Sequence, residues 1–193
     1  MEEQEILRQY DRLDGEHICL RRFTLADAPA VFAYGSDPEV VRYLSWGPLT
    51  APEQAAQTIL LRYLNNPSLW AIALPENDLC IGCIDLRVEP GCAKGSFGYC
   101  LAREYWGRGY AAEALELILR LGLGVLGLNK MEGSHYGGNT ASGRVQEKCG
   151  MIREGVLRQN VWAKGQWWDL VCYGILREEW LARQKNTLCP PQR

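Results

Sequence analysis

Apolar and polar residues follow two different periods along this chain, and these periods divide it into expected strands and helices. Alternating or short unbroken apolar runs predict strands, over residues 17–24, 69–74, 80–88, 96–101, 130–136, 153–162 and 166–176. Apolar residues spaced three and four positions apart predict helices, over residues 26–33, 39–44, 52–65, 111–125, 140–148 and 177–184. The polar segment 1–16 is predicted as frayed chain or a short helix, and 189–191 as a loose tail. This order of elements predicts an α+β fold with a mixed, mostly antiparallel central sheet of about seven strands flanked by helices.

Two of the expected helices begin with capping signals. Thr24, with Asp27 at the third helical position, resembles a capping box, in which two side chains satisfy unpaired amides of the first turn. Thr50, followed by Pro52 and Glu53, repeats the signal before the helix over 52–65. We therefore expect helices to start at both points.

Length and composition indicate one globular domain. The chain has 193 residues, of which 47% are hydrophobic and 23% charged, and it shows no linker or internal repeat. A net charge of −2 gives no electrostatic basis for nucleic-acid binding. No uncharged apolar run approaches the roughly 18 residues of a membrane span, and the acidic start MEEQEILRQY lacks an apolar signal-peptide region. We therefore expect a cytoplasmic protein with no membrane or nucleic-acid partner.

The eight cysteines do not form the pattern of a disulfide framework or a zinc site. Most lie inside apolar, strand-like runs, where a free cysteine behaves as a small hydrophobic residue. Cys80 and Cys83 form a C-x-x-C pair, but on a strand residues three apart point to opposite faces. No second pair and no suitably spaced histidine completes a zinc set. We expect no metal and a reducing compartment.

The stretch 96–126 has the arrangement of an anion site: a strand, a glycine-containing loop and an amphipathic helix. The first amides of a helix have no intrahelical acceptor, and the helix dipole places partial positive charge there. Gly107 and Gly109 tolerate positive φ and leave the backbone open to a ligand, and Arg108 lies between them. A tight turn that binds nothing explains these glycines equally well. A Walker loop is excluded because no Lys-Ser or Lys-Thr follows them.

Residues 107–111, Gly-Arg-Gly-Tyr-Ala, preceded by an aromatic strand, resemble the pyrophosphate loop of the GNAT N-acetyltransferase superfamily. The usual form is [QR]-x-x-G-x-[GA]; Gly109 and Ala111 match it, whereas Trp106 stands where Gln or Arg is commonest. Together with the sequence Asn-Thr-Ala-Ser at 139–142, this substitution resembles the branch that acetylates N-termini of ribosomal proteins. The resemblance covers roughly residues 18–180 and implies one GNAT domain within 1–193.

The resemblance also implies a set of acetyl-CoA contacts. Residues 99–101 are expected to diverge from the strand at 131–136, so that their free backbone groups pair with the pantetheine arm as an added strand would. The amide of Leu101 is expected to polarise the thioester carbonyl, as in an oxyanion hole. The expected cofactor-binding residues are Tyr99, Leu101, Trp106, Gly107, Arg108, Gly109, Tyr110, Ala111, Asn139 and Ser142.

Catalytic assignments follow the same resemblance. Many GNAT enzymes place a tyrosine at the position of Gln146 to protonate the leaving thiolate, and this chain departs from that pattern. Ser142 is therefore the expected donor, directly or through water, with Tyr136 as the alternative. Asn139 and Ser142, three apart at a helix start, face the same side, although Asn139 also suits a plain N-cap role.

Glu132 and Asp169 are the expected candidates for a general base. Glu132 is equally explained as an ion-pair partner, and Asp169 as a group that orients backbone. His135 is a third candidate, through water. A strong base is dispensable for an N-terminal substrate, because the reference pKa of an α-amine is about 7.7–8.0, against about 10.4 for lysine.

Trp46 and Trp168 are the expected substrate-binding residues. Trp46 lies in a loop that overhangs the acceptor site in GNAT folds, although a tryptophan there also serves to plug an interhelical gap. Trp167 and Trp168 point to opposite faces of a strand, so one of them is free to line a cleft or a dimer contact.

The resulting hypothesis is an acetyl-CoA-dependent N-acetyltransferase, monomer or homodimer, that acts on a primary amine. The first choice of acceptor is a protein or peptide N-terminus. A small amine such as an antibiotic or polyamine is the alternative, and a CoA-binding sensor or scaffold without turnover is the rival from another class.

Overall fold

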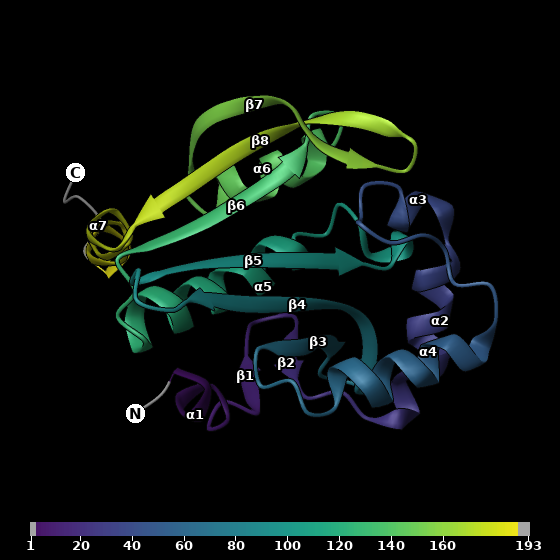
Figure 1. The fold of residues 1–193 in the computed structure, drawn as a ribbon. Coiled ribbons are helices and arrows are strands. Elements are labelled where there is room, and N and C mark those ends of the chain that lie inside the picture. Colours follow the sequence, from purple (N-terminus) through teal and green to yellow (C-terminus); the bar gives the residue numbers. More distant parts are fainter. Residues whose placement is uncertain (1–2, 189–193) are drawn as a thin grey trace.

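A central β-sheet with helices on both faces forms the body of the protein (Figure 1). The computed structural model describes residues 3–188. Within them the strands are β1 (Arg12–Asp14), β2 (Cys19–Arg21), β3 (Leu69–Leu74), β4 (Leu79–Glu89), β5 (Lys94–Leu101), β6 (Lys130–Tyr136), β7 (Ile152–Ala163) and β8 (Gln166–Leu176). The α-helices are α1 (Glu3–Leu7), α2 (Ala28–Ser36), α3 (Pro38–Val41), α4 (Pro52–Thr58), α5 (Tyr110–Leu119), α6 (Thr140–Lys148) and α7 (Arg177–Leu188). The architecture is α+β, as predicted.

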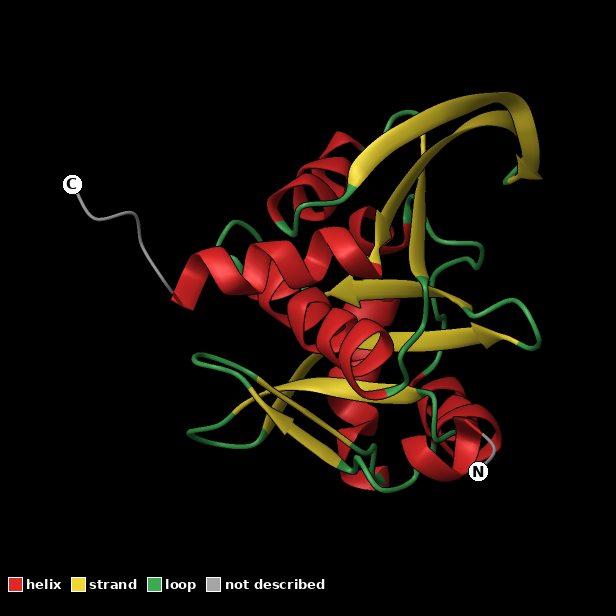
Figure 2. Ribbon diagram, turned by 90° about the vertical axis from the view of Figure 1, so that its left-hand side faces the viewer, coloured by secondary structure: helices red, strands yellow, loops and turns green. Residues whose placement is uncertain are grey.

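The sheet order is β1-β2-β3-β4-β5-β6-β8-β7, and every neighbouring pair is antiparallel except β5 and β6. The seven expected strands are all present, and the described residues contain an eighth, β1. β1 was not predicted, because its three residues, Arg12–Asp14, carry no apolar alternation and become a strand through backbone pairing to β2 at the sheet edge. Figure 2 shows the long β7–β8 hairpin arching over the top of the molecule.

The parallel pair β5 and β6 separates after three residue pairs. The register joins Lys94 to Lys130, Gly95 to Met131 and Ser96 to Glu132, and no pairing follows. Residues 97–101 of β5 therefore remain bonded to β4 alone, while β6 continues along β8. The expected divergence of residues 99–101 from β6 is present, and we call the resulting gap the fork.

Two apolar clusters cover the two faces of the sheet. Alternate residues of β3 show the division: Trp70 and Ile72 pack with α5, whereas Leu69 and Ala71 pack with α2 and α4. The face of α5 is fully buried at Ala114, Leu115 and Ile118, in line with its apolar period.

Two of the predicted helices, those over 52–65 and 111–125, end in a wider, π-helical turn. The helix that begins with α4 continues as a π-helix over Ile59–Tyr63, and α5 continues as one over Arg120–Val125. In an i→i+5 turn each residue adds a smaller rotation about the helix axis than in an α-helix. The end of the predicted helix over 111–125 therefore leaves the α-helical phase, and Val125 is exposed.

One capping prediction is confirmed and the other is displaced by one residue. Asp27 Oδ2 accepts a hydrogen bond from the Thr24 amide at 2.8 Å, and both members of that capping box are present. At the second start the cap is Ala51, and Gln54 rather than Glu53 returns its side chain to the Thr50 amide at 2.8 Å. Glutamine serves there because the box needs a side-chain oxygen acceptor and no charge.

Candidate active site

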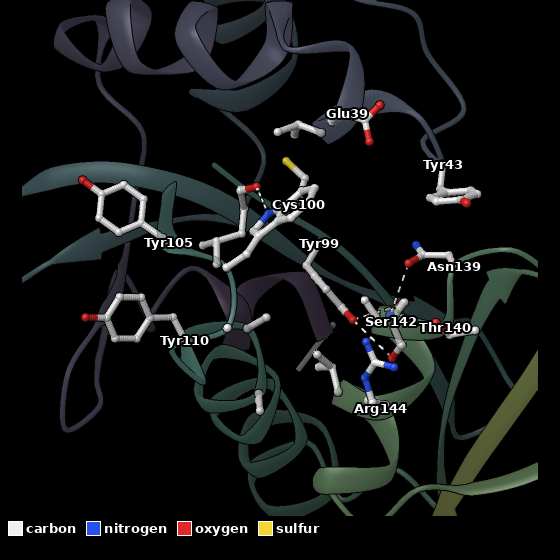
Figure 3. Close-up of a pocket in the computed structure, with 18 of the residues that line it drawn as sticks. Glu39, Tyr43, Tyr99, Cys100, Tyr105, Tyr110, Asn139, Thr140, Ser142 and Arg144 are labelled. Carbon is white, nitrogen blue, oxygen red and sulfur yellow. Dashed lines mark hydrogen bonds between the residues drawn. The ribbon is translucent and has the colours of Figure 1, made fainter. Parts of the chain in front are cut away.

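A pocket of about 640 Å³ opens at the fork (Figure 3). Its walls come from the end of β5, the loop after it, the first turns of α5 and α6, and the segment that begins with α3. We call the part lined by residues 106, 107, 109–112, 138–142, 144, 145 and 148 the cofactor end. The part lined by residues 39–44 is called the acceptor end.

The glycine loop has the conformation that the sequence predicts. Gly107 and Gly109 have φ values of +76° and +89°, a region that other residues rarely adopt. Gly109 is also the N-cap residue of α5, so the free amides of the helix start face the pocket that Tyr110 and Ala111 line. A Cβ atom added at Gly107 would meet nothing within 4 Å, whereas at Gly109 it would lie 3.5 Å from Lys148 Nζ.

Trp106 fastens this loop to the strand before it. Its indole Nε1 donates to the Leu101 carbonyl at 2.7 Å, and its ring lines the pocket. This contact accounts for tryptophan at a position where Gln or Arg is commoner in the loop that the chain resembles. Arg108 is not among the residues that line the pocket; its guanidinium lies over the ring of Tyr105, 5.4 Å from the centroid.

Two basic residues that the sequence analysis did not select line the cofactor end. Arg144 and Lys148 are four residues apart on α6 and therefore share a face. Their positions in the sequence do not show which side of α6 faces the glycine loop; in the structure both line the pocket, and Lys148 Nζ lies beside Gly109. Together with the helix N-termini they make this end suited to an anion.

The end of β5 presents unpaired backbone to the fork. The Ala102 amide donates to the Ile81 carbonyl of β4 at 2.8 Å. Because successive amides of a strand point in opposite directions, the Leu101 N–H points away from β4 and into the fork. Tyr99 shares that orientation, two residues earlier. Both residues line the pocket, and an extended amide-containing ligand has hydrogen-bonding partners here.

Tyr99, Asn139 and Ser142 meet at the fork. Asn139 is the N-cap of α6, and its side chain accepts from the Ser142 amide at 3.3 Å. The hydroxyls of Tyr99 and Ser142 are 2.9 Å apart. Burial raises the pKa of Tyr99 to about 12, against the opposing effect of its hydrogen bond to Ser142.

Gln146 and Tyr136 occupy different surroundings. The Gln146 side chain is fully buried and its Nε2 donates to Ser142 Oγ at 3.4 Å. Tyr136, the alternative proton donor, stacks on Trp168 with ring centroids 5.3 Å apart and does not line the pocket.

The structure places the predicted base candidates away from the pocket. Glu132 lies 2.9 Å from Lys130 and 3.7 Å from Lys94, and the bond from Lys130 lowers the pKa of this carboxyl. Asp169 accepts from the Gln159 amide at 2.8 Å and so holds an irregular point of the β7–β8 hairpin. Each residue has the structural role that we gave as its alternative. Buried His135 packs beside Tyr173 and also lies outside the pocket lining.

Glu39 is the one carboxylate among the described residues that line the pocket, and the sequence analysis missed it. It lies in the first turn of α3, whose N-cap Asp37 accepts from the Glu39 amide at 2.8 Å. Figure 3 shows Glu39 on the α3 side of the pocket, across from Arg144. Its nearest cation is Arg42 at 3.6 Å, and both side chains are about half exposed.

A second cavity of about 450 Å³ adjoins the acceptor end and shares Arg42 with it. Trp168 lines this cavity and meets Tyr43 edge to face, with ring centroids 5.7 Å apart. Trp167 lies on the opposite face of the hairpin against Trp162, as the strand period requires. Trp46 lies in the loop beside the second cavity but lines neither.

The cysteines show no metal chemistry within residues 3–188. Cys83 Sγ faces Cys100 Sγ across β4 and β5 at 3.4 Å, whereas Cys80 is buried and pairs with Ala73 at the register shift between β3 and β4. In this part of the chain no group of three or more His, Cys, Asp or Glu side chains is placed to hold a metal ion. None of the helices described is long and apolar enough to cross a bilayer.

Comparisons with known proteins agree with this geometry. A family model described as an acetyltransferase (GNAT) domain matches residues 17–152. An uncharacterized N-acetyltransferase of Bacillus licheniformis is 31% identical over 172 residues, which cover 86% of this chain and 96% of the relative. A Bacillus subtilis protein with the provisional name ribosomal N-acetyltransferase is 30% identical over 120 residues, 62% of this chain and 65% of that protein.

A solved structure has the same fold. The GNAT-family acetyltransferase from Bacillus anthracis superimposes with a TM-score of 0.81 at 28% identity, and the alignment covers 87% of this chain and 99% of that one. The family match, the fork and the glycine loop at a helix start agree with one another. The chain belongs to the acetyltransferase (GNAT) domain family and is an acetyl-CoA-dependent N-acetyltransferase.

Proposed function

We propose that this enzyme transfers the acetyl group to the α-amine at the N-terminus of a protein or peptide, by direct attack of the amine on the thioester. The observation that carries the proposal is the charge of the pocket. Among the described residues one carboxylate, that of Glu39, lines about 640 Å³ of space that also presents three basic side chains. A single carboxylate suits an acceptor with a single positive charge.

A polyamine is the less favoured acceptor for the same reason. Polyamines carry several ammonium groups, and each one needs an acidic partner when it leaves water. The second cavity adds no carboxylate; its charged lining residues are Arg42 and Lys164. The relative from Bacillus subtilis, provisionally named a ribosomal N-acetyltransferase, agrees with a protein acceptor.

The cofactor end is proposed to hold the phosphates of acetyl-CoA. The amides of residues 107–111, at the start of α5, bind the pyrophosphate, and the side chains of Arg144 and Lys148 add charge-assisted bonds. Trp106 keeps the loop in place through its bond to Leu101. The open positive-φ glycines fit this role because they leave the backbone accessible.

The fork is proposed to hold the pantetheine arm and the thioester. The free backbone groups of Tyr99 bind the amides of the arm, in the manner of an added strand. The Leu101 N–H points into the fork and stabilises the oxyanion that forms on the thioester carbonyl. Asn139 fixes the first turn of α6, from which Ser142 serves the departing sulfur.

The acceptor amine is proposed to enter past α3 and the tip of the β7–β8 hairpin. Glu39 binds its ammonium group, and the aromatic side chains of Tyr43 and Trp168 form the wall of the entrance. An α-amine, of reference pKa about 7.7–8.0, loses its proton to water readily at neutral pH. Glu132 and Asp169 have no part in the proposal because other partners in the structure occupy them.

Release of free thiol from acetyl-CoA tests this function. The panel contains a short peptide with a free N-terminus, the same peptide with an acetylated N-terminus and one internal lysine, and spermidine. We expect turnover with the first peptide alone, with mass spectrometry placing the acetyl group on the α-amine. If spermidine is acetylated faster than the first peptide, the acceptor is a polyamine and the proposed N-terminal acceptor is wrong. If no amine of the panel is acetylated, the enzyme accepts neither of these classes of amine.

A further inference from the structure

The hydroxyl of Ser142 lies at the centre of a small hydrogen-bonded group at the fork. Tyr99 approaches it from β5, with the two oxygens 2.9 Å apart, and Gln146 approaches from one turn further along α6, with Nε2 3.4 Å from Ser142 Oγ. Tyr99 and Ser142 line the pocket, whereas Gln146 lies fully buried behind them. Figure 3 shows Tyr99 extending toward Ser142.

Gln146 Nε2 can only donate to Ser142 Oγ, whereas in the Tyr99–Ser142 pair either hydroxyl can be the donor, and we take Tyr99 as that donor. A serine hydroxyl has one proton to donate and two lone pairs to accept with. When Tyr99 and the Gln146 amide both donate to Ser142 Oγ, its two lone pairs are used. The proton of Ser142 then has no partner within the group and is left for a ligand in the pocket.

We propose that Tyr99 and Gln146 are positioning residues that turn the Ser142 O–H toward the leaving sulfur, where it stabilises the thiolate as a hydrogen-bond donor. This inference rests on the proposed function for the identity of the reaction and for the placement of the thioester sulfur at the fork. It assigns to this chain a device in place of the tyrosine that many GNAT enzymes carry at the position of Gln146.

The chemistry of the step is balanced without a protein acid. The amine nitrogen forms a bond to the acetyl carbon and releases one proton to water, and the bond between that carbon and sulfur breaks with its electron pair going to sulfur. Ser142 donates a hydrogen bond to the thiolate while keeping its proton. Tyr99 also keeps its proton, because a hydroxyl whose pKa burial raises to about 12 does not protonate a thiolate whose reference pKa is about 8.5. Water supplies the proton that the sulfur takes up.

Other ionisable groups face the same space and act on the thiolate as well. They are Glu39, Arg42 and Tyr43 from α3 and the residues after it, Cys100 from β5, Arg144 and Lys148 from α6, and Tyr105 and Tyr110 on the loop side. Cys149 lies close enough to Tyr99 to raise its pKa slightly. Because single substitutions of Tyr99 and Ser142 leave all these groups in place, their effects report the hydroxyl pair.

The pKa of the thiol of bound CoA tests the proposal without any acceptor. It is measured from the ultraviolet absorbance of the thiolate in the complex of the protein with CoA, as a function of pH. A charge-assisted hydrogen bond is worth about 1.5–3 kcal/mol, so we expect Ser142→Ala to raise the thiol pKa by about one pH unit and Tyr99→Phe by roughly half as much. In Ser142→Ala, adding Tyr99→Phe should then raise it no further.

Tyr173→Phe is the matched control, because it also removes a tyrosine hydroxyl bonded to a residue of α6. Tyr173 donates to Glu147 at 2.9 Å from β8, outside the pocket lining. This variant should leave the thiol pKa unchanged, and circular dichroism should show all variants folded. With an accepted amine, Tyr99→Phe should lower kcat about fivefold and leave KM for acetyl-CoA within twofold.

Two results would overturn the proposal. Equal effects of Tyr99→Phe in the wild-type and Ser142→Ala backgrounds would show that Tyr99 acts independently of Ser142. An unchanged thiol pKa in Ser142→Ala would show that the serine does not donate to sulfur. Failure of the acceptor panel alone would contradict the proposed acceptor and leave the CoA measurement as a separate test.

Discussion

The two ends of the pocket are built in different ways. The cofactor end uses backbone from one continuous stretch, the loop and first turn of α5 at 106–112, with two side chains added from α6. The acceptor end is assembled from side chains of α3 and its following loop, with the tip of the β7–β8 hairpin beside it. Residues 43 and 168, which touch there, are 125 positions apart in the chain.

The two ends should therefore respond differently to substitution. Helix amides and positive-φ glycines bind a phosphate through the backbone, so the loop part of the cofactor end depends on backbone conformation more than on the identity of its side chains. The acceptor end depends on individual side chains such as Glu39, and one substitution alters its charge. Damage to the first end should therefore abolish cofactor binding, whereas damage to the second should alter acceptor choice alone.

Substitution of the N-cap glycine of α5 is expected to have the largest effect. Gly109→Glu forces a φ of +89° on a residue with a side chain, and its carboxylate competes with the phosphates for the helix start and Lys148. We expect affinity for acetyl-CoA, measured by calorimetry, to fall at least about a hundredfold. Gly91→Glu, at φ +76° in an exposed turn, imposes similar strain elsewhere and should retain affinity; equal loss in both variants would contradict the loop assignment.

Removal of the α6 cations is expected to have an intermediate effect. Arg144→Ala and Lys148→Ala should each weaken acetyl-CoA binding about tenfold, because each removes a charge-assisted bond to a phosphate. The affinity that remains should depend less on salt concentration. Arg158→Ala, which removes an exposed cation of β7, is the control; similar losses in all three variants would indicate a general charge effect.

Neutralising the acceptor end is expected to have the smallest effect on the cofactor and a selective effect on the amine. Glu39→Gln should raise KM for the peptide amine by roughly five- to tenfold, since a partly exposed charge pair contributes about 1 kcal/mol. Calorimetry should show affinity for acetyl-CoA within twofold of wild type. The control is Glu53→Gln, an exposed carboxylate of α4. If KM is unchanged in Glu39→Gln, the ammonium site lies elsewhere.

The same division explains what could be predicted from the sequence. The strand periods, the Thr24 cap and the conformation of the glycine loop are local signals that a window of a few residues carries, whereas the ligand of that loop is not. The wider turn at Arg120–Val125 was missed because an i→i+5 bond depends on packing below the helix: Gly122 lies against the Met131 sulfur there. The eighth strand was missed because it is made by its neighbour's backbone.

The candidate site was predictable to the same extent. Gly107, Gly109 and Ser142 line the pocket, and each belongs to a short motif that the sequence shows: the glycine loop before α5 and the Asn-Thr-Ala-Ser start of α6. Glu39 was missed because nothing in its local pattern distinguishes it from any exposed glutamate at a helix start; only the contact of α3 with the end of β5 brings it to the pocket. Glu132 was selected because it lies on a strand beside the fork, but its side chain turns to two lysines.

The fork also makes the stability of the folded enzyme depend on the concentration of acetyl-CoA. Only three residue pairs join β5 to β6, so the backbone beyond them lacks the bonds that an inner strand normally makes on both sides. A molecule that fills the fork adds those bonds in the folded state alone, and mass action then favours that state increasingly as its concentration rises above Kd. When acetyl-CoA is scarce, the enzyme would be less stable as well as inactive, so the supply of acetyl-CoA would influence the lifetime of each enzyme molecule.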